Sequence, residues 1–402
     1  MAIKIFKLIK LLISSKIIFK EPKKSKIVLY DNASLEDFEN VLEKKEYFLL
    51  INRINQIKEI YIFPRLFYLI FLNYKGNIAT SYFVSILEII NPKVVITFTD
   101  NCLKFSEITK ILEKKMKFIA IQNAYRLDFI EHNYSFKKKL LNYNYNNKIY
   151  LPHLFTHGEY EFDLYKKLKI KVKKMTKFGS LRLENALHYL KKNNFNFRKK
   201  ENDICLISEI IWYAHFSGSN QKFQSDLIKS GVVKLAKYTI DFCREHNKKL
   251  IFIPKVRKKG REMDWELSVF KENLNYDDYL FLMKSIKKKY SKRHHQYLAM
   301  FRSKVTIGVT STMLGENLSQ NNKILSCNLT KNSVFDFAIK KICSINDCSY
   351  IQFKKRLNYI LDIDEEKYFS LISKKNMNYL IHHKQDSSQI KFLKEKINRH
   401  LS

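Results

Sequence analysis

The chain has 402 residues, enough for two or three domains, and its hydrophobic fraction of 46% is ample for packed cores. It has no stretch of about 20 uncharged apolar residues, so we expect no membrane-spanning helix. Lys and Arg number 74 against 39 Asp and Glu, a net charge of +35, which suits a polyanionic partner such as nucleic acid, an acidic membrane face or phosphates. The abundance of Lys, Asn and Ile is also typical of an AT-rich genome, which explains the charge without any partner.

The six cysteines have no CxxC spacing, and most lie in apolar runs, where they serve as small core residues. We therefore expect a reducing cytoplasm, with neither a disulfide framework nor a zinc site. Only 8 Gly and 5 Pro occur in the chain, so each of them is expected to have a steric reason.

The N-terminus is basic and apolar. Residues 2–20 read AIKIFKLIKLLISSKIIFK, with Lys4, Lys7 and Lys10 at helical spacing between Ile, Leu and Phe. No small-residue cleavage site follows, which weakens the alternative of a signal peptide. We expect residues 1–25 to form a basic amphipathic helix that either lies on an anionic membrane surface or docks on the first domain as an ordinary helix.

Strands alternate with helices from residue 26 to residue 180, which predicts a first domain with a parallel sheet covered on both faces. The apolar run KVVITFT is typical of a strand buried in such a sheet. The predicted strands are 27–31, 47–52, 60–63, 93–99, 117–122 and 151–156, and the predicted helices are 64–74, 78–90 and 103–115.

Polar residues lie at the carboxyl ends of three of these strands. They are Asp100 and Asn101, Gln122 and Asn123, and His157. Because open α/β sheets bind ligands at the carboxyl ends of their strands, this edge is the predicted binding edge of the first domain.

A second alternation follows a polar, basic hinge at 181–202, which itself begins with a helix. We place a second Rossmann-like domain at 203–345 and a helical tail at 346–402. The predicted strands of the second domain are 203–208, 249–254, 305–309 and 323–328, and its predicted helices are 223–247, 290–300 and 313–318. The predicted helices of the tail are 350–361, 365–374 and 389–397. The chain is thus expected to be α/β, with two doubly wound domains facing a cleft and C-terminal helices, a GT-B-like layout.

The stretch 305–329 reads as strand, hydroxyl turn, short helix and strand. Thr310, Ser311 and Thr312 enter the helix, whose first N–H groups and dipole suit a phosphate. Glu316 follows one turn later, where a carboxylate can accept the hydroxyls of a ribose or sugar. The alternative is a plain crossover in which these hydroxyls only cap the helix.

Three segments resemble the bacterial surface-carbohydrate biosynthesis transferases and, more distantly, the CDP-glycerol glycerophosphotransferases and capsule polysaccharide transferases. They are VVITFTDNCLKF with FIAIQNAYR within 94–126, FGSLR at 178–182, and VTIGVTSTMLGENLSQNNKIL at 305–325. The chain departs from the family pattern at Ala124, where Gly is usual after Gln-Asn, and at Asn317, where the helix usually has small residues.

The resemblance implies a nucleotide-activated sugar, or a related glycerol or polyol phosphate donor, bound by the second domain. In that site Ser311 and Thr312 hold the diphosphate and Glu316 accepts hydroxyls. Lys255 and Arg257 neutralise the leaving phosphate, and since no DxD motif occurs within the two predicted domains (residues 26–345), we expect no metal ion and no cofactor. Ser208 and Ser180 are further predicted donor contacts, with turn formation as their alternative role.

The first domain is expected to bind a glycan or lipid-linked acceptor through Asn101, Gln122, Asn123 and Arg126. A base must deprotonate the acceptor hydroxyl, and Asp100 and His157 are the candidates because both cap strands of this domain. The adjacent His294 and His295 point to different faces of a helix and are interpreted as surface residues rather than metal ligands.

Two other classes of function stay open. A nucleic-acid-binding protein fits the charge, but Lys is spread along the whole chain and no recognised motif occurs, so no specific nucleic acid is expected. A non-catalytic scaffold of surface-polysaccharide assembly fits the two departures from the family pattern. The expected location is the cytoplasm, at the inner face of the membrane if residues 1–26 bind it.

Overall fold

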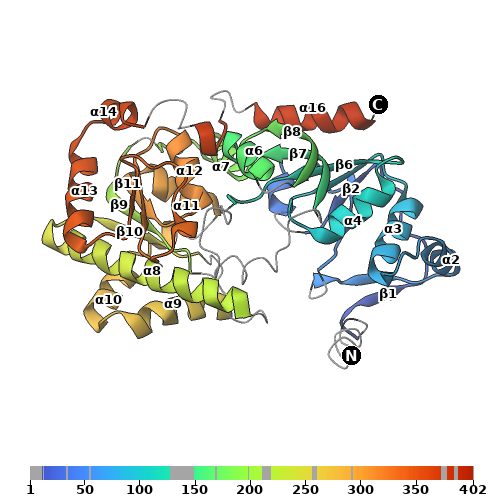
Figure 1. Cartoon of the computed structure of the whole chain (residues 1–402), viewed down its shortest axis with the longest axis horizontal. Coiled ribbons are helices and arrows are strands. Elements are labelled where there is room, and N and C mark those ends of the chain that lie inside the picture. Colours follow the sequence, from blue (N-terminus) through green and yellow to red (C-terminus); the bar gives the residue numbers. More distant parts are fainter. Residues whose placement is uncertain are drawn as a thin grey trace.

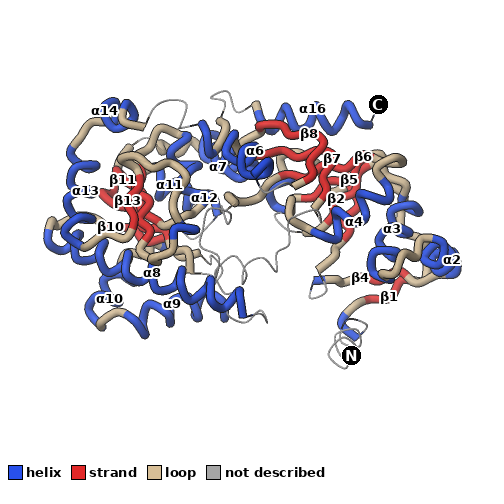
Figure 2. Tube along the Cα trace, in the orientation of Figure 1, coloured by secondary structure: helices blue, strands red, loops and turns tan. Residues whose placement is uncertain are grey.

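The chain folds into two Rossmann-like α/β domains, as expected. The computed structural model describes residues 11, 13–32, 35–53, 56–126, 149–167, 170–197, 199–210, 219–255, 260–290, 293–372, 378–383 and 388–401. Figure 2 shows two separate groups of strands, each flanked by helices, side by side along the longest axis. Within the described part of the chain, no helix combines the length and the hydrophobicity that crossing a membrane requires.

The first sheet has six parallel strands in the order β3-β2-β5-β6-β7-β8. Helices α3 and α4 cover one face, where buried residues of β2, β5 and β6 pack against them, and the C-terminal helix α16 covers part of the other. The elements are β2 (Ile27–Tyr30), β3 (Tyr47–Leu50), α3 (Ile78–Ile90), β5 (Val94–Thr97), α4 (Leu103–Leu112), β6 (Lys117–Ile121), β7 (Tyr150–Thr156), α6 (Glu159–Lys167) and β8 (Lys171–Lys177).

The second sheet has five parallel strands in the order β10-β9-β11-β12-β13. Both faces are buried in one hydrophobic core, and helix α7 leads into it from the first domain. The elements are α7 (Leu181–Lys192), β9 (Asn202–Ile207), α8 (Ser219–Glu245), β10 (Leu250–Ile253), α9 (Arg261–Asn273), α10 (Tyr276–Lys284), α11 (Arg293–Phe301), β11 (Ser303–Gly308), α12 (Thr312–Ser319), β12 (Ile324–Asn328) and β13 (Ser344–Asn346).

The tail crosses from the second domain back to the first (Figure 1). Helices α13 (Tyr350–Asp362) and α14 (Glu365–Ser370) lie on the second domain, whereas α16 (Gln389–Leu401) buries Leu393 and Ile397 in the core of the first. The tail therefore ties the two domains together.

Three of the eight glycines lie against the crossing segment 378–383. A Cβ on Gly158 would lie 2.3 Å, and one on Gly179 2.2 Å, from a main-chain carbonyl oxygen of this segment. A Cβ on Gly315 would lie 3.2 Å from the side chain of Ile381. Gly179 also has a φ of +98°, which L side chains rarely adopt. The expectation that the scarce glycines have steric reasons is confirmed at these positions.

The helix expected over residues 1–25 is wrong in its C-terminal part. Lys16–Ile18 forms strand β1, which pairs in parallel with β4 (Glu59–Tyr61), just before helix α2 (Pro64–Leu72). The hydroxyl of Ser15 donates to the carbonyl of Ile57, and the β-branched residues that follow favour an extended chain. Residues 1–10 lie outside the described residues.

Candidate functional site

The carboxyl edges of the two sheets meet. The backbone N–H of Tyr125, four residues after β6 ends, donates to Oγ1 of Thr312 at 2.9 Å, at the start of α12. In both domains the chain reverses its winding direction at one point of the sheet, and such switch points are where doubly wound sheets bind ligands. In the second domain that point lies between β9 and β11, beside Thr312. The residues predicted from the two halves of the sequence are therefore brought to one junction.

Asp100 forms a buried ion pair on the first-domain side of this junction. It is fully buried, and its two carboxylate oxygens accept hydrogen bonds from the guanidinium of Arg126. The Tyr165 hydroxyl, from α6, donates to the same carboxylate. Arg126 also donates to Oδ1 of Asn123 at 3.3 Å. The pair fixes the chain that follows β6 against the end of β5.

A second buried group joins β6, β7 and α6. The amide of Gln122 donates to Oε1 of Glu161 at 2.7 Å and accepts the backbone N–H of His157 at 2.8 Å. All three residues are at most 2% exposed. Among the described residues, neither Oε2 of Glu161 nor Nδ1 of His157 has a hydrogen-bond partner. Glu161 and His157 are thus two titratable groups at the predicted binding edge, and each has one side-chain atom that makes no hydrogen bond within the described residues.

Burial moves the pKa values of these two groups in opposite directions. It raises the pKa of Glu161 to about 8 and lowers the pKa of His157 to about 3, because each loses the hydration of its charged form. At neutral pH the Glu161 carboxyl is therefore largely protonated, and the His157 imidazole is neutral. Glu161 was not predicted from the sequence.

We expect the variant Glu161→Gln to gain stability relative to the parent chain as the pH rises from about 4.5 to 8. The folded-state pKa of Glu161 is raised, so its contribution is favourable at low pH and is lost as the pH rises through about 8. Glutamine does not titrate, so it does not lose that contribution. Melting temperatures of both chains across this range measure the difference, and a constant difference would mean that Glu161 titrates normally.

The turn before α12 already binds a carboxylate. Both oxygens of Glu209, which follows β9, accept the backbone N–H of Thr310, at 3.0 and 2.8 Å. Glu209 is 4% exposed, and burial raises its pKa to about 7. Ser311 caps α12 by accepting the N–H of Met313. The turn thus donates an N–H to a side chain of the protein, and its contact with a donor phosphate stays a prediction.

Glu316 lies inside the junction rather than on its surface. It is 1% exposed, and its oxygens accept the hydroxyl of Ser180 and, at 2.8 Å, that of Tyr297. Ser180 also caps α7 by accepting the N–H of Leu183. A ribose or sugar can reach Glu316 only if these hydrogen bonds open, and its contact with the donor stays a prediction.

The other predicted residues are placed as follows. Ser208 is fully buried at the end of β9, where its hydroxyl accepts the N–H of Ile210 at 3.3 Å. Lys255 is exposed after β10, next to β9, and its backbone N–H donates to Glu266. Asn101 is half-buried after β5. Arg257 lies outside the described residues.

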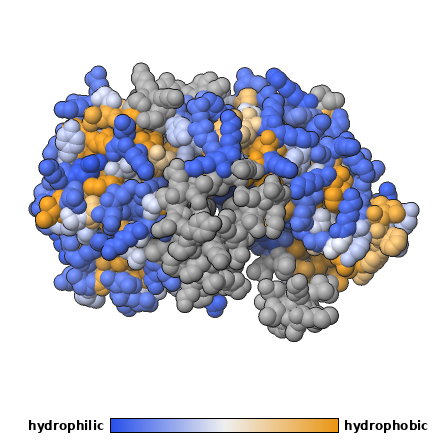
Figure 3. Space-filling model, in the orientation of Figure 1, coloured by the Kyte–Doolittle hydropathy of each residue, from blue (hydrophilic) through white to orange (hydrophobic). Residues whose placement is uncertain are grey.

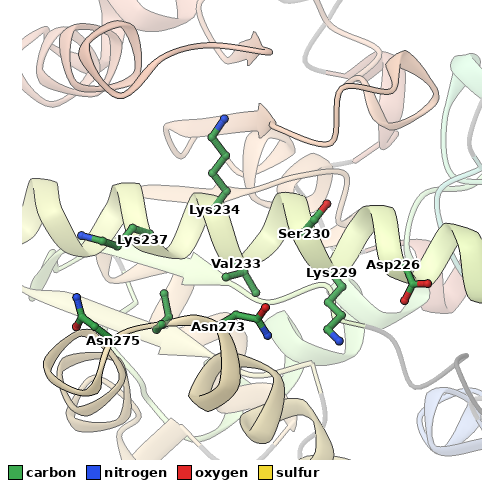
Figure 4. Close-up of a pocket in the computed structure, with 9 residues that line it drawn as sticks. Asp226, Lys229, Ser230, Val233, Lys234, Lys237, Asn273 and Asn275 are labelled. Atoms are coloured by element: carbon green, nitrogen blue, oxygen red, sulfur yellow. The ribbon is translucent and has the colours of Figure 1, made fainter.

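Four pockets stand out on the described surface, and none is lined by a predicted site residue. One of about 250 Å³ lies between the domains, with Tyr160 of α6 and Tyr379 of the tail on its wall. A larger one, of about 570 Å³, lies between α8 and the loop at 273–275 (Figure 4). No three His, Cys, Asp or Glu residues of the described chain are placed to hold a metal ion.

The fold is that of GT-B-type enzymes. A wall teichoic acid polymerase, TagF, solved with CDPG, superposes with a TM-score of 0.52 at 10% identity, over 94% of this chain and 89% of the other. UDP-GlcNAc 2-epimerase from Neisseria meningitidis, bound to UDP-GlcNAc, superposes with a TM-score of 0.50 at 12% identity, over 94% and 99%. No protein-family model matches the chain, and no curated protein matches it.

These similarities show the fold alone, and the fold agrees with the expected GT-B-like layout. The predicted α/β architecture with two Rossmann-like domains is therefore correct. The roles of the individual site residues stay predictions.

Proposed function

We propose that this chain is a GT-B-type transferase that uses a nucleotide-activated sugar, or a glycerol or polyol phosphate donor, to build a bacterial surface polysaccharide. One observation carries the proposal. The hydrogen bond from Tyr125 to Thr312 brings the binding edges of both domains together, so groups of both domains can act on one pair of substrates. TagF, solved with CDPG, and the epimerase, bound to UDP-GlcNAc, share this fold.

In the proposed reaction an acceptor hydroxyl attacks the donor, and the bond to the nucleoside phosphate breaks. Lys255 and Arg257 neutralise the charge on the departing phosphate together with the N-terminal end of α12, and no metal ion or cofactor takes part. Donor phosphates take the position at the Ser311–Thr312 turn where the Glu209 carboxylate now accepts an N–H.

The acceptor proton passes to a base on the first-domain side. Asp100 and His157 are the predicted bases, and Glu161 joins them because a carboxyl group with a pKa of about 8 can both accept and donate a proton near neutral pH. The acceptor, a glycan or lipid-linked saccharide, is bound by Asn101, Gln122, Asn123 and Arg126. We place the reaction in the cytoplasm, at the inner face of the membrane.

A melting-temperature screen tests the proposal. The full chain is heated with CMP-, CDP-, UDP-, GDP- and dTDP-linked compounds. A ligand at a hundredfold excess over its Kd should stabilise the folded chain by about 2.7 kcal/mol and raise the melting temperature by several degrees. One nucleotide class should raise it and the others should not.

The second candidate, a non-catalytic scaffold, is favoured by the hydrogen bonds already made at the turn. Glu209, Ser311, Thr312 and Glu316 all have partners within the protein. If no nucleotide raises the melting temperature, the transferase proposal is wrong and the scaffold is preferred.

A further inference from the structure

The outer face of helix α2 is apolar and exposed. Phe67, Tyr68, Phe71 and Leu72 share this face by helical spacing and are 57 to 78% exposed, while Leu66, on the opposite face, is buried. The helix thus turns apolar side chains toward water on the side away from the core. Burying them against another apolar phase would stabilise the chain by about 25 cal/mol for each Å² covered.

This apolar face continues onto neighbouring elements. Of the fourteen large hydrophobic residues that are exposed in the described chain, nine lie between residues 13 and 78. Figure 3 shows hydrophobic side chains gathered at the end of the molecule where α2 lies. We call this group the α2 surface; it comprises Ile13, Ile17, Phe19, Phe67, Tyr68, Phe71, Leu72, Tyr74 and Ile78.

Strand pairing links the N-terminal residues of this group to the chain that enters α2. Strand β1, which contains Ile17, pairs with β4, and β4 leads directly into α2. Tyr74 and Ile78 then continue the surface from the end of α2 into α3. Residues far apart in the sequence therefore lie beside one another.

Basic residues outnumber acidic ones in the segments that contain the α2 surface. The segments 13–26 and 56–78 contain eight Lys and Arg against two Glu, and all eight are exposed. One of the two glutamates, Glu21, is paired with Arg65 at 3.2 Å. Each Lys or Arg near an anionic lipid surface contributes about 1 kcal/mol to binding, so this excess of positive charge favours a bilayer with negative headgroups over a neutral apolar partner.

Aromatic residues favour the same occupant. Five of the nine residues of the α2 surface are Phe or Tyr, whose rings settle at the boundary between headgroups and acyl chains. An apolar face and an excess of exposed Lys and Arg are two separate attractions, and stable attachment of a protein to a bilayer usually requires two.

We propose that the α2 surface is the part of this chain that binds an anionic lipid bilayer. The inference deepens the proposed function, which places the reaction at the inner face of the membrane. It also extends the attachment predicted for residues 1–26 to a folded element of the first domain. A lipid-linked acceptor would then meet the enzyme at the bilayer surface.

Co-sedimentation of the full chain with vesicles tests the proposal. The chain should bind phosphatidylcholine vesicles that contain phosphatidylglycerol, bind pure phosphatidylcholine vesicles weakly, and dissociate as salt is added. The double variant Phe67→Ser/Phe71→Ser should bind the anionic vesicles at least about tenfold more weakly. Both side chains are exposed, so its melting temperature should match that of the parent chain.

The matched control is Ile351→Ser/Tyr359→Ser on α13, where two other large hydrophobic residues are exposed on the second domain. This variant should bind vesicles as the parent chain does. Equal binding by all three chains, or no vesicle binding by the parent chain, would overturn the proposal. So would a dimer, detected by light scattering, that the Phe67→Ser/Phe71→Ser variant alone cannot form. Vesicle binding is measured without nucleotide, so it supports the surface whether or not a donor binds.

Discussion

Replacing Arg126 by alanine is expected to destabilise the chain by about 3 to 5 kcal/mol. The fully buried carboxylate of Asp100 would lose the guanidinium that pairs with it and, among the described residues, would keep the hydroxyl of Tyr165 as its partner. Urea unfolding of the variant and the parent chain gives the difference. The cost is large because a buried charge without a counter-charge is far less stable than in water.

Two controls distinguish the effect of an unpaired buried charge on stability from the effect of removing a long side chain. Lys173→Ala breaks an ion pair with Glu113 whose lysine is 61% exposed, and it should change the stability far less than Arg126→Ala. Asp100→Asn, added to Arg126→Ala, removes the unpaired negative charge and should restore part of the stability that Arg126→Ala loses. If Arg126→Ala costs no more than Lys173→Ala, the pair does not hold the first-domain edge together.

Replacing Gly158 by alanine is expected to cost about 3 kcal/mol or more, because the new methyl group has no room. Its Cβ would lie 2.3 Å from the carbonyl oxygen of Tyr379 and 2.5 Å from that of Leu380. Both atoms belong to the main chain of the crossing segment, so they cannot move aside as a side chain does. Urea unfolding measures the cost, and limited proteolysis should cut the tail of the variant faster than that of the parent chain.

Gly308→Ala is the matched control. The nearest atom to its Cβ is a side-chain carbon of Leu314 at 3.3 Å, which can give way. Its cost should be well below that of Gly158→Ala. Equal costs, or a tail that resists proteolysis in both variants, would show that the tail does not lock the domains through Gly158.

The fold could be predicted where the burial of an element requires a regular pattern of apolar residues in the sequence. Helix α3 was predicted at the bounds it has, because its apolar period ends at Asn91-Pro92. Strand β8 was missed because it lies at the edge of the sheet, and lysines line it, as they often do on edge strands. Helix α6 was missed as well, although acidic residues begin it and lysines end it, a pattern that fits the helix dipole.

Glu161 was not predicted as a site residue because helix α6 was not predicted. Glu161 lies on α6 and meets Gln122, 39 residues earlier, only because β6 and β7 are neighbours in the sheet. Likewise, Ser180 and Glu316 are 136 residues apart and meet where α7 and α12 approach each other. Sequence periodicity shows which residues follow a strand, but it does not show which of them pair across a domain junction.

The two residues at which the chain departs from the family pattern, Asn317 and Ala124, both make hydrogen bonds in the structure. Asn317 is fully buried in α12, and its amide donates to the hydroxyl of Thr306 on β11 at 2.9 Å. The carbonyl of Ala124 accepts a hydrogen bond from the Gln122 amide at 2.9 Å. Both residues thus support the junction, and neither departure removes a group that the proposed reaction uses.

Calorimetric titration of three chains tests the central claim most directly, namely that a nucleotide-activated donor binds at the carboxyl edge of the second domain. The chains are the parent, Lys255→Ala, and the control Lys304→Ala, whose exposed lysine lies near the opposite end of the sheet. We predict that one nucleotide class binds the parent and Lys304→Ala equally, and Lys255→Ala about tenfold more weakly, which is about 1.4 kcal/mol. Equal binding by all three chains, or no binding by the parent, would contradict the claim.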